Sequence, residues 1–163
     1  MNNHQIEYYL ENDPKFLGCF PHDSLGDLRV APNSSSSSIL GGHQTGVLTR
    51  LSPRKTKSII INTDSGRGEH WVAMVLTGGK CFYFDSFGLP IINTNILNYV
   101  NTKKYKTVTY SNQCIQDYLS TSCGLFCIAF VMYVKNRKDY LSFLSIFKED
   151  LRCNDSVVKN LLK

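Results

Sequence analysis

The sequence predicts an α+β protein in which helices pack around a small, mostly antiparallel sheet. Short apolar runs rich in Ile, Val, Phe and Tyr lie in the middle of the chain, as expected for strands. Apolar residues at helical spacing occur towards both ends instead. Strands and helices that occupy separate stretches are typical of the α+β class. A length of 163 residues fits one domain covering 1–163.

The N-terminal third predicts one short helix and a long polar loop. Gln5–Glu11 carries apolar residues at helical spacing, and Asn12-Asp13-Pro14 would end that helix. Phe16–Phe20 is interpreted as a short apolar anchor. Residues 22–54 contain a run of serines, prolines and paired glycines with little periodicity, so we expect an irregular serine-rich insert or flap.

Three strands are expected next. Ser58–Asn62 holds three consecutive isoleucines and predicts a buried strand. Trp71–Leu76 and Lys80–Phe84 flank Thr77-Gly78-Gly79, which favours a β-hairpin.

The remaining chain alternates helices with one short strand. A helix is expected over Ile91–Asn101, and Thr107–Tyr110 is a short β-rich run. Amphipathic stretches follow at Tyr140–Phe147 and Ser156–Leu162. In the helix over Ile91–Asn101, one face would carry Ile92, Ile96, Leu97 and Val100. The last helix, Ser156–Leu162, would be capped by Asn154 or Asp155.

Composition and charge argue against several classes of protein. No apolar run approaches the ~20 residues that span a bilayer, and the N-terminus lacks a secretory signal. The six cysteines should therefore stay reduced, and they form no C-x-x-C pair, so no metal site is expected. The net charge of +5 permits weak attraction to DNA. The basic clusters lack interleaved aromatics, however, which favours a solvated face.

A thiol stands at the start of the most apolar helical stretch. Cys123 directly precedes the run that continues to Val134. A cysteine in a first helical turn faces unpaired N–H groups, which favour the thiolate of a nucleophile. Taken alone, a buried cysteine at the start of a core helix is usually a small core residue. Cys127 lies one turn later and should face inward as such a core residue.

His70 and Asp85 stand at the two ends of the predicted hairpin. Residues that begin one strand and end its antiparallel partner lie at the same edge of a sheet. The carboxylate could therefore orient one imidazole nitrogen and leave the other for a nucleophile. The competing interpretation is an exposed turn histidine near an exposed aspartate.

A side-chain amide ahead of Cys123 could complete the site. Gln116 lies in the preceding loop and could form an oxyanion hole with the Cys123 backbone N–H. Gln113 is a competing candidate that spacing does not exclude.

These segments resemble the family of adenain, the adenovirus maturation protease, with relatives in virophages and polinton-like elements, in a clan shared with deSUMOylating proteases. The resemblance implies a papain-like or adenain-like cysteine protease fold. It also implies His70 as general base, Asp85 as its orienter, Gln116 as oxyanion donor and Cys123 as nucleophile. Trp71 would cover the imidazole and bind substrate together with Gly68 and Glu69. The matching pieces, in family order, are Phe16-Leu17-Gly18, Ile61-Asn62-Thr63, Gly68-Glu69-His70-Trp71, Phe84-Asp85-Ser86-Phe87-Gly88, Gln116 and Ser122-Cys123-Gly124-Leu125-Phe126-Cys127.

By this resemblance, the expected function is a cysteine endopeptidase that cleaves viral capsid or core precursors at small residues such as glycine. No cofactor is required, although a peptide or DNA activator is left open. We expect a monomer in the virion and host-cell interior, neither secreted nor in a membrane. The chain departs from adenain at Asp85, where adenain has glutamate, and at Tyr105, which aligns near the cysteine that tethers adenain's activator. A disulfide-tethered activator is therefore not expected.

Two other functions remain open on the sequence. An isopeptidase that removes ubiquitin-like modifiers would use the same four residues. A non-catalytic binding module could keep the same fold.

Overall fold

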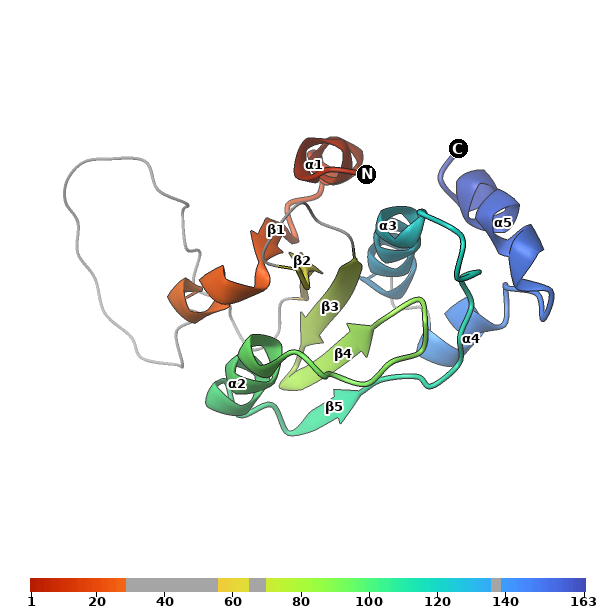
Figure 1. The fold of residues 1–163 in the computed structure, drawn as a ribbon. Helices are drawn as coiled ribbons and strands as arrows, with labels where there is room; N and C mark the ends of the chain where they lie inside the picture. The colour runs from red at the N-terminus through yellow and green to blue at the C-terminus, as the bar shows by residue number, and fades with distance from the viewer. Residues whose placement is uncertain (29–55, 65–69, 136–138) are drawn as a thin grey trace.

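A mixed five-stranded sheet organises the fold (Figure 1). The computed structural model describes residues 1–28, 56–64, 70–135 and 139–163. Along the sheet, neighbours follow chain order. The strands are β1 (Phe16–Pro21), β2 (Lys57–Asn62), β3 (Trp71–Thr77), β4 (Lys80–Phe84) and β5 (Thr107–Thr109).

The central part of this sheet is antiparallel and its edges are parallel. β2–β3 and β3–β4 pair antiparallel, whereas β1–β2 and β4–β5 pair parallel. The α+β class is confirmed. The two parallel edges were not predicted, because an apolar run carries no information about the direction of its partner.

The β3–β4 hairpin brings distant residues to one edge of the sheet. Thr77 pairs with Lys80, so the loop is Gly78-Gly79, and both glycines have positive φ, at 54° and 80°. Two-residue loops of this kind match the strand twist, and side chains other than Gly, Asn and Asp rarely adopt them. The hairpin is confirmed. It places the beginning of β3 beside the end of β4.

Helices cover both faces of the sheet and create two cores. One face packs against α1 (Asn3–Leu10), α3 (Cys123–Lys135), α4 (Tyr140–Leu144) and α5 (Asn154–Leu161). The other face packs against the 3-10 helix η1 (His22–Asp27) and α2 (Thr94–Thr102). β3 serves both cores, since Ala73 and Val75 belong to the first, and Val72 and Met74 to the second.

α3 is the most deeply buried helix of the first core. Phe130 stacks on Phe84 of β4 with ring centroids 4.6 Å apart. Its last residue, Lys135, forms an ion pair with Asp13 at 2.5 Å and so ties the helix to the turn before β1. This packing holds the first turn of α3 in place against the sheet.

Several local expectations were wrong. The expected anchor Phe16–Phe20 is strand β1, and the start of the expected loop at 22–54 forms η1. The rest of that insert, from residue 29 on, lies outside the described residues. α2 begins after its N-cap Asn93, so Ile92 precedes the helix and is 74% exposed.

Two helix details also differ from the sequence pattern. Leu97 is 41% exposed, and Tyr99 is buried in the core where Leu97 was expected. The buried face of the shorter α2 thus differs from the face that the sequence predicts. α5 follows the 3-10 helix η2 (Leu151–Cys153), so its N-cap position is Cys153, without a side-chain bond. Asn154 and Asp155 lie inside the helix, and both make long-range contacts instead of capping it.

No helix in the described part of the chain is long and apolar enough to cross a membrane. Within the same ranges, no group of three His, Cys, Asp or Glu side chains could hold a metal ion. None of the six cysteines, which all lie in the described ranges, forms a disulfide.

Candidate active site

His70 and Asp85 meet at the end of the hairpin opposite its turn, where β3 begins and β4 ends. His70 Nε2 lies 3.0 Å from Asp85 Oδ2, and Asp85 Oδ1 accepts the Phe87 N–H at 2.8 Å. Each carboxylate oxygen therefore has a partner, and the side chain is 4% exposed. The competing interpretation of an exposed pair is wrong for Asp85. Its carboxylate is held rigidly enough to orient the ring.

The turn after Asp85 packs directly on the loop that carries Gln116. Gly88 has a φ of +72°, and a Cβ placed there would lie 2.7 Å from the Gln113 backbone and 2.8 Å from that of Asn112. The glycine is needed both for the left-handed conformation and for this close approach. The carboxylate turn and the Gln116 loop are thereby fixed to one another.

The electrostatics of His70 favour its charged form. Burial lowers the pKa of the ring, but hydrogen bonds to Asp85 and Cys123, and the negative charge of both groups, outweigh burial and raise it to about 9. Nδ1 bonds no nitrogen or oxygen of the described residues. Because Nε2 is committed to Asp85, we attribute the interaction with the thiol to Nδ1. An imidazolium is the form that activates a neighbouring thiol.

Cys123 shows the complementary perturbation. Burial by itself raises the pKa of this thiol, yet hydrogen bonds to the His70 side chain and to the Trp71 and Gly124 backbone hold it below the ordinary cysteine value. Cys127 is fully buried, and burial raises its pKa well above that value. Its Sγ donates to the Trp71 carbonyl at 3.3 Å. The two thiols thus differ in chemical state although they share one helix.

Gln116 is buried at a junction between loops. Its Oε1 accepts the Ser86 hydroxyl at 2.6 Å, and its Nε2 donates to the Ser120 carbonyl at 2.8 Å. The Ser120 carbonyl can only accept, so it determines which end of the amide carries the nitrogen. Nε2 also lies 3.5 Å from the Ser120 hydroxyl, a longer contact than that to the carbonyl. Gln113 is exposed, so burial favours Gln116 of the two candidates, and its role as oxyanion donor remains a prediction.

The substrate-binding role of Trp71, Gly68 and Glu69 remains a prediction, and the structure describes only Trp71 of the three. Trp71 is 1% exposed, and its indole N–H donates to the Met1 carbonyl at 3.3 Å. The ring that stacks on His70 is Phe87, at a centroid distance of 5.0 Å, rather than Trp71. A substrate could contact the indole only after Met1 is displaced. Gly68 and Glu69 lie outside the described residues.

Sequence reasoning missed three residues that support the site. Phe87 stacks on His70 and in turn on Tyr118, 5.6 Å away. The Ser86 hydroxyl donates to the Gln116 amide, and Asp155 accepts the hydroxyl of Ser120, later in the same loop. Adjacency to Asp85 was a signal for Ser86 and Phe87. No sequence signal pointed to Asp155, because its partners are more than 30 residues away.

A model of the adenovirus endoprotease family matches residues 40–145. The chain belongs to the adenovirus endoprotease family. Membership confirms the resemblance seen in the sequence and places the chain among the cysteine proteases. The matched region contains all four residues expected to be catalytic.

The chain is also similar to one curated protein and to solved structures. It is 26% identical over 106 residues to the mitochondrial fumarate hydratase of Danio rerio, a match that covers 65% of this chain and 19% of that protein. The ASFV pS273R protease has a TM-score of 0.60 at 17% identity, covering 98% of this chain and 63% of that one. The central domain of an uncharacterized protein, Lpg1148, from Legionella pneumophila has a TM-score of 0.57 at 12% identity, covering 99% and 93%. These structural likenesses support the fold. The chain spans only a fifth of the zebrafish protein, so that match assigns no activity here.

Proposed function

We propose that the chain is a cysteine endopeptidase that cleaves viral capsid or core precursor proteins next to small residues, often glycine. The observation that carries the proposal is the paired perturbation of His70 and Cys123. The first has a pKa raised to about 9, and the second has a pKa held below its ordinary value. A protonated His70 beside a thiol whose pKa is lowered favours the imidazolium–thiolate pair, the state in which a thiol attacks a carbonyl.

The catalytic cycle follows from these charges. The Cys123 thiolate adds to the scissile carbonyl, and the oxyanion that forms is stabilised by the Gln116 Nε2–H and the Cys123 backbone N–H. His70 donates its proton to the leaving amine as the C–N bond breaks, which leaves a thioester. A water then gives a proton to His70 and attacks the thioester. Collapse of this second intermediate releases the acid and regenerates the thiolate.

The substrate class is inferred from the family. Adenovirus endoprotease membership favours protein substrates of a virion, and the clan characteristically accepts small residues beside the scissile bond. We expect the protein to act as a monomer in the virion and host-cell interior. No cofactor takes part in the cycle above. DNA or a peptide remains a candidate activator, with weak DNA binding through the basic side chains.

Cleavage of a diverse peptide library by the purified protein tests this function. Wild type should cut at small residues, while Cys123→Ala and His70→Ala should fold and be inactive. Each assay is repeated with added DNA and with added peptides to test activation. Turnover by Cys123→Ala would overturn the assignment. A preference for ubiquitin-like conjugates over every peptide would favour an isopeptidase instead.

A further inference from the structure

The first turn of α5 contacts the loop that carries Gln116. Asp155 Oδ1 accepts the Ser120 hydroxyl at 2.7 Å, and its Oδ2 accepts the Ser122 hydroxyl at 2.9 Å. One carboxylate therefore holds two residues of the segment between Gln116 and Cys123. The partners are 35 and 33 residues away in sequence.

Ser120, which Asp155 holds, also bonds the side chain of Gln116. Its carbonyl accepts the Gln116 Nε2–H at 2.8 Å, and its hydroxyl also accepts the Ser122 N–H at 3.1 Å. The hydroxyl has a single hydrogen, which it donates in the hydrogen bond to Asp155. The orientation of Ser120, and with it the position of the amide nitrogen of Gln116, depends on the carboxylate.

Ser122, which Asp155 also holds, directly precedes the nucleophile Cys123. Its carbonyl accepts the N–H groups of Leu125 at 2.8 Å and Phe126 at 3.2 Å, so it starts the first turn of α3. Its hydroxyl is held by the other oxygen of Asp155. Both groups expected to bind the oxyanion, the Gln116 amide and the Cys123 N–H, are thus one residue removed from the same carboxylate.

A different residue docks α5 itself. Asn154 is fully buried, and its Nδ2 donates to the Ile115 and Lys148 carbonyls at 2.9 Å each. Its Oδ1 accepts the Lys148 N–H at 2.8 Å. Val158 completes the anchor in the core. The helix would therefore stay in place without Asp155, which separates docking of α5 from control of the loop.

We propose that Asp155 is a positioning residue that sets the geometry of the oxyanion hole from outside the site. This role rests on the proposed function, because it concerns the same reaction. An oxyanion donor acts only when it is aimed at the position that the charge will occupy, and a displacement of about 1 Å can lower the rate about 100-fold. Asp155 touches neither substrate nor thiol, so it acts only through Ser120 and Ser122.

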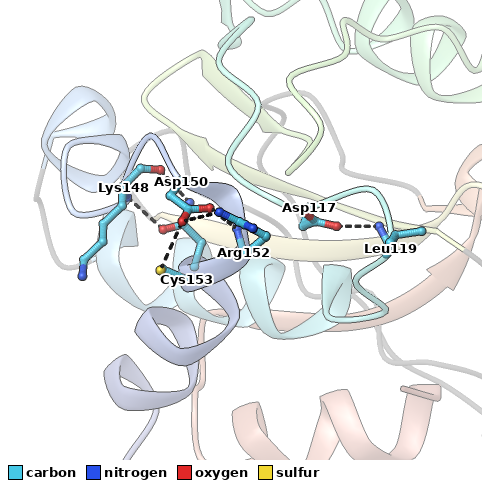
Figure 2. Close-up of polar contacts among 7 residues, drawn as sticks. Asp117, Leu119, Lys148, Asp150, Arg152 and Cys153 are labelled. Carbon is cyan, nitrogen blue, oxygen red and sulfur yellow. Dashed lines mark hydrogen bonds and ion pairs between the residues drawn. The ribbon is translucent and has the colours of Figure 1, made fainter.

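The chain offers a matched control in Asp150, whose own contacts Figure 2 shows. Asp150 lies just before α5 and pairs with Arg152 at 2.9 Å, with side-chain exposures of 48% and 81%. The loop has its own local bond in the same view, from the Leu119 N–H to Asp117 at 2.8 Å. Asp150→Ala removes the same charge as Asp155→Ala from the same segment. Asp150 makes no hydrogen bond to the loop among the described residues, although its partner Arg152 interacts with the charge of Asp117 in that loop.

The first test is steady-state kinetics on the full chain with a peptide substrate. Asp155→Ala should lower kcat about 10- to 100-fold with KM within about twofold. Asp155→Asn, which keeps one acceptor, should fall between this variant and wild type, and Asp150→Ala should match wild type. Alkylation of Cys123 by iodoacetamide forms no oxyanion, so its rate and pH profile should be unchanged in Asp155→Ala. A kcat within twofold of wild type, or an alkylation rate that falls as far as kcat, would overturn the proposal.

The second test does not depend on turnover. Amide hydrogen exchange in Asp155→Ala should be faster across residues 116–122 and unchanged in α5. If exchange of the loop is unaltered, the positioning role is wrong even if the enzyme is active. If wild type cleaves no substrate but the loop is loosened, the proposed function fails and the positioning contact stands. Should Asp155→Ala not fold, Asp155→Asn decides both measurements, because it preserves the shape of the side chain.

Discussion

Replacing Asp85 by asparagine tests the electrostatic basis of the site most directly. The side chain keeps its size and can still accept the Phe87 N–H, but the charge next to His70 Nε2 is lost. His70 has a pKa raised from 6.5 to about 9 in spite of its burial, with Asp85 the leading cause of the increase. The difference of about 2.5 pKa units corresponds to about 3 kcal/mol in favour of the imidazolium.

The effect on the thiolate can be worked out at pH 7.5. A group with a pKa of about 9 is about 97% protonated at that pH, whereas one with a pKa of 6.5 is about 9% protonated. If the pKa returned to 6.5, Asp85→Asn would lower the imidazolium population about tenfold at this pH, and burial of the ring acts in the same direction. Since that cation holds the pKa of Cys123 down, the thiolate population should fall with it. At higher pH the thiol ionises without the cation, so the difference should become smaller as the pH rises.

The assay is the second-order rate of Cys123 alkylation by iodoacetamide between pH 5 and 10. The profile of Asp85→Asn should be displaced to higher pH, with a roughly tenfold lower rate at pH 7.5. Peptide kcat/KM should fall further, because the leaving amine also needs the His70 proton. Asp150→Asn, an exposed carboxylate, is the control. An unchanged alkylation profile would refute the argument that Asp85 maintains the ion pair.

Three further outcomes are expected. Iodoacetamide at neutral pH should label Cys123 at least about 100-fold faster than Cys127, as read by peptide mass spectrometry, and equal labelling in the folded protein would contradict their assigned states. Ser86→Ala should lower kcat about tenfold with little change in KM, because the Gln116 amide can then rotate; a change confined to KM would count against this role. Lys135→Met should lower the free energy of unfolding by about 2 kcal/mol in urea titrations, since the Asp13 carboxylate, 8% exposed, loses its partner. Its kcat should stay at the wild-type value, and a stability loss below about 0.5 kcal/mol would show a pair of the weak, surface type.

The pattern of apolar residues was sufficient for the central sheet and for the order of the site. Ser58–Asn62 and the two halves of the hairpin coincide with β2, β3 and β4 within one residue. The agreement has a local cause, because buried strands select β-branched and aromatic residues and the Gly78-Gly79 turn admits little else. The hairpin then brings His70 and Asp85 together without any long-range information.

Helix faces were predicted less well than strands. α2 begins three residues later than expected and ends one residue later, so Ile92 precedes the helix, and Tyr99 is buried whereas Leu97 is exposed. Helix boundaries depend on which cap forms, and Asn93 accepts both the Asn95 and Ile96 N–H groups. The same uncertainty made Asn154 and Asp155 look like caps, when the fold uses them as tertiary contacts.

By itself the sequence determined that a thiol, an imidazole, a carboxylate and an amide occur in an order that matches one protease family. These four groups lie in short segments, so the residues on either side of each were enough to predict its role. Only the tertiary structure decided how the groups are held: Gln116 between Ser86 and Ser120, His70 against Phe87, and the loop of Ser120 and Ser122 by Asp155. The reason is that Ser86 and Asp155 lie 30 or more positions from their partners in the Gln116 loop, and no local pattern records which buried polar groups satisfy one another. The nucleophile could be read from the chain, whereas its support could be read only from the fold.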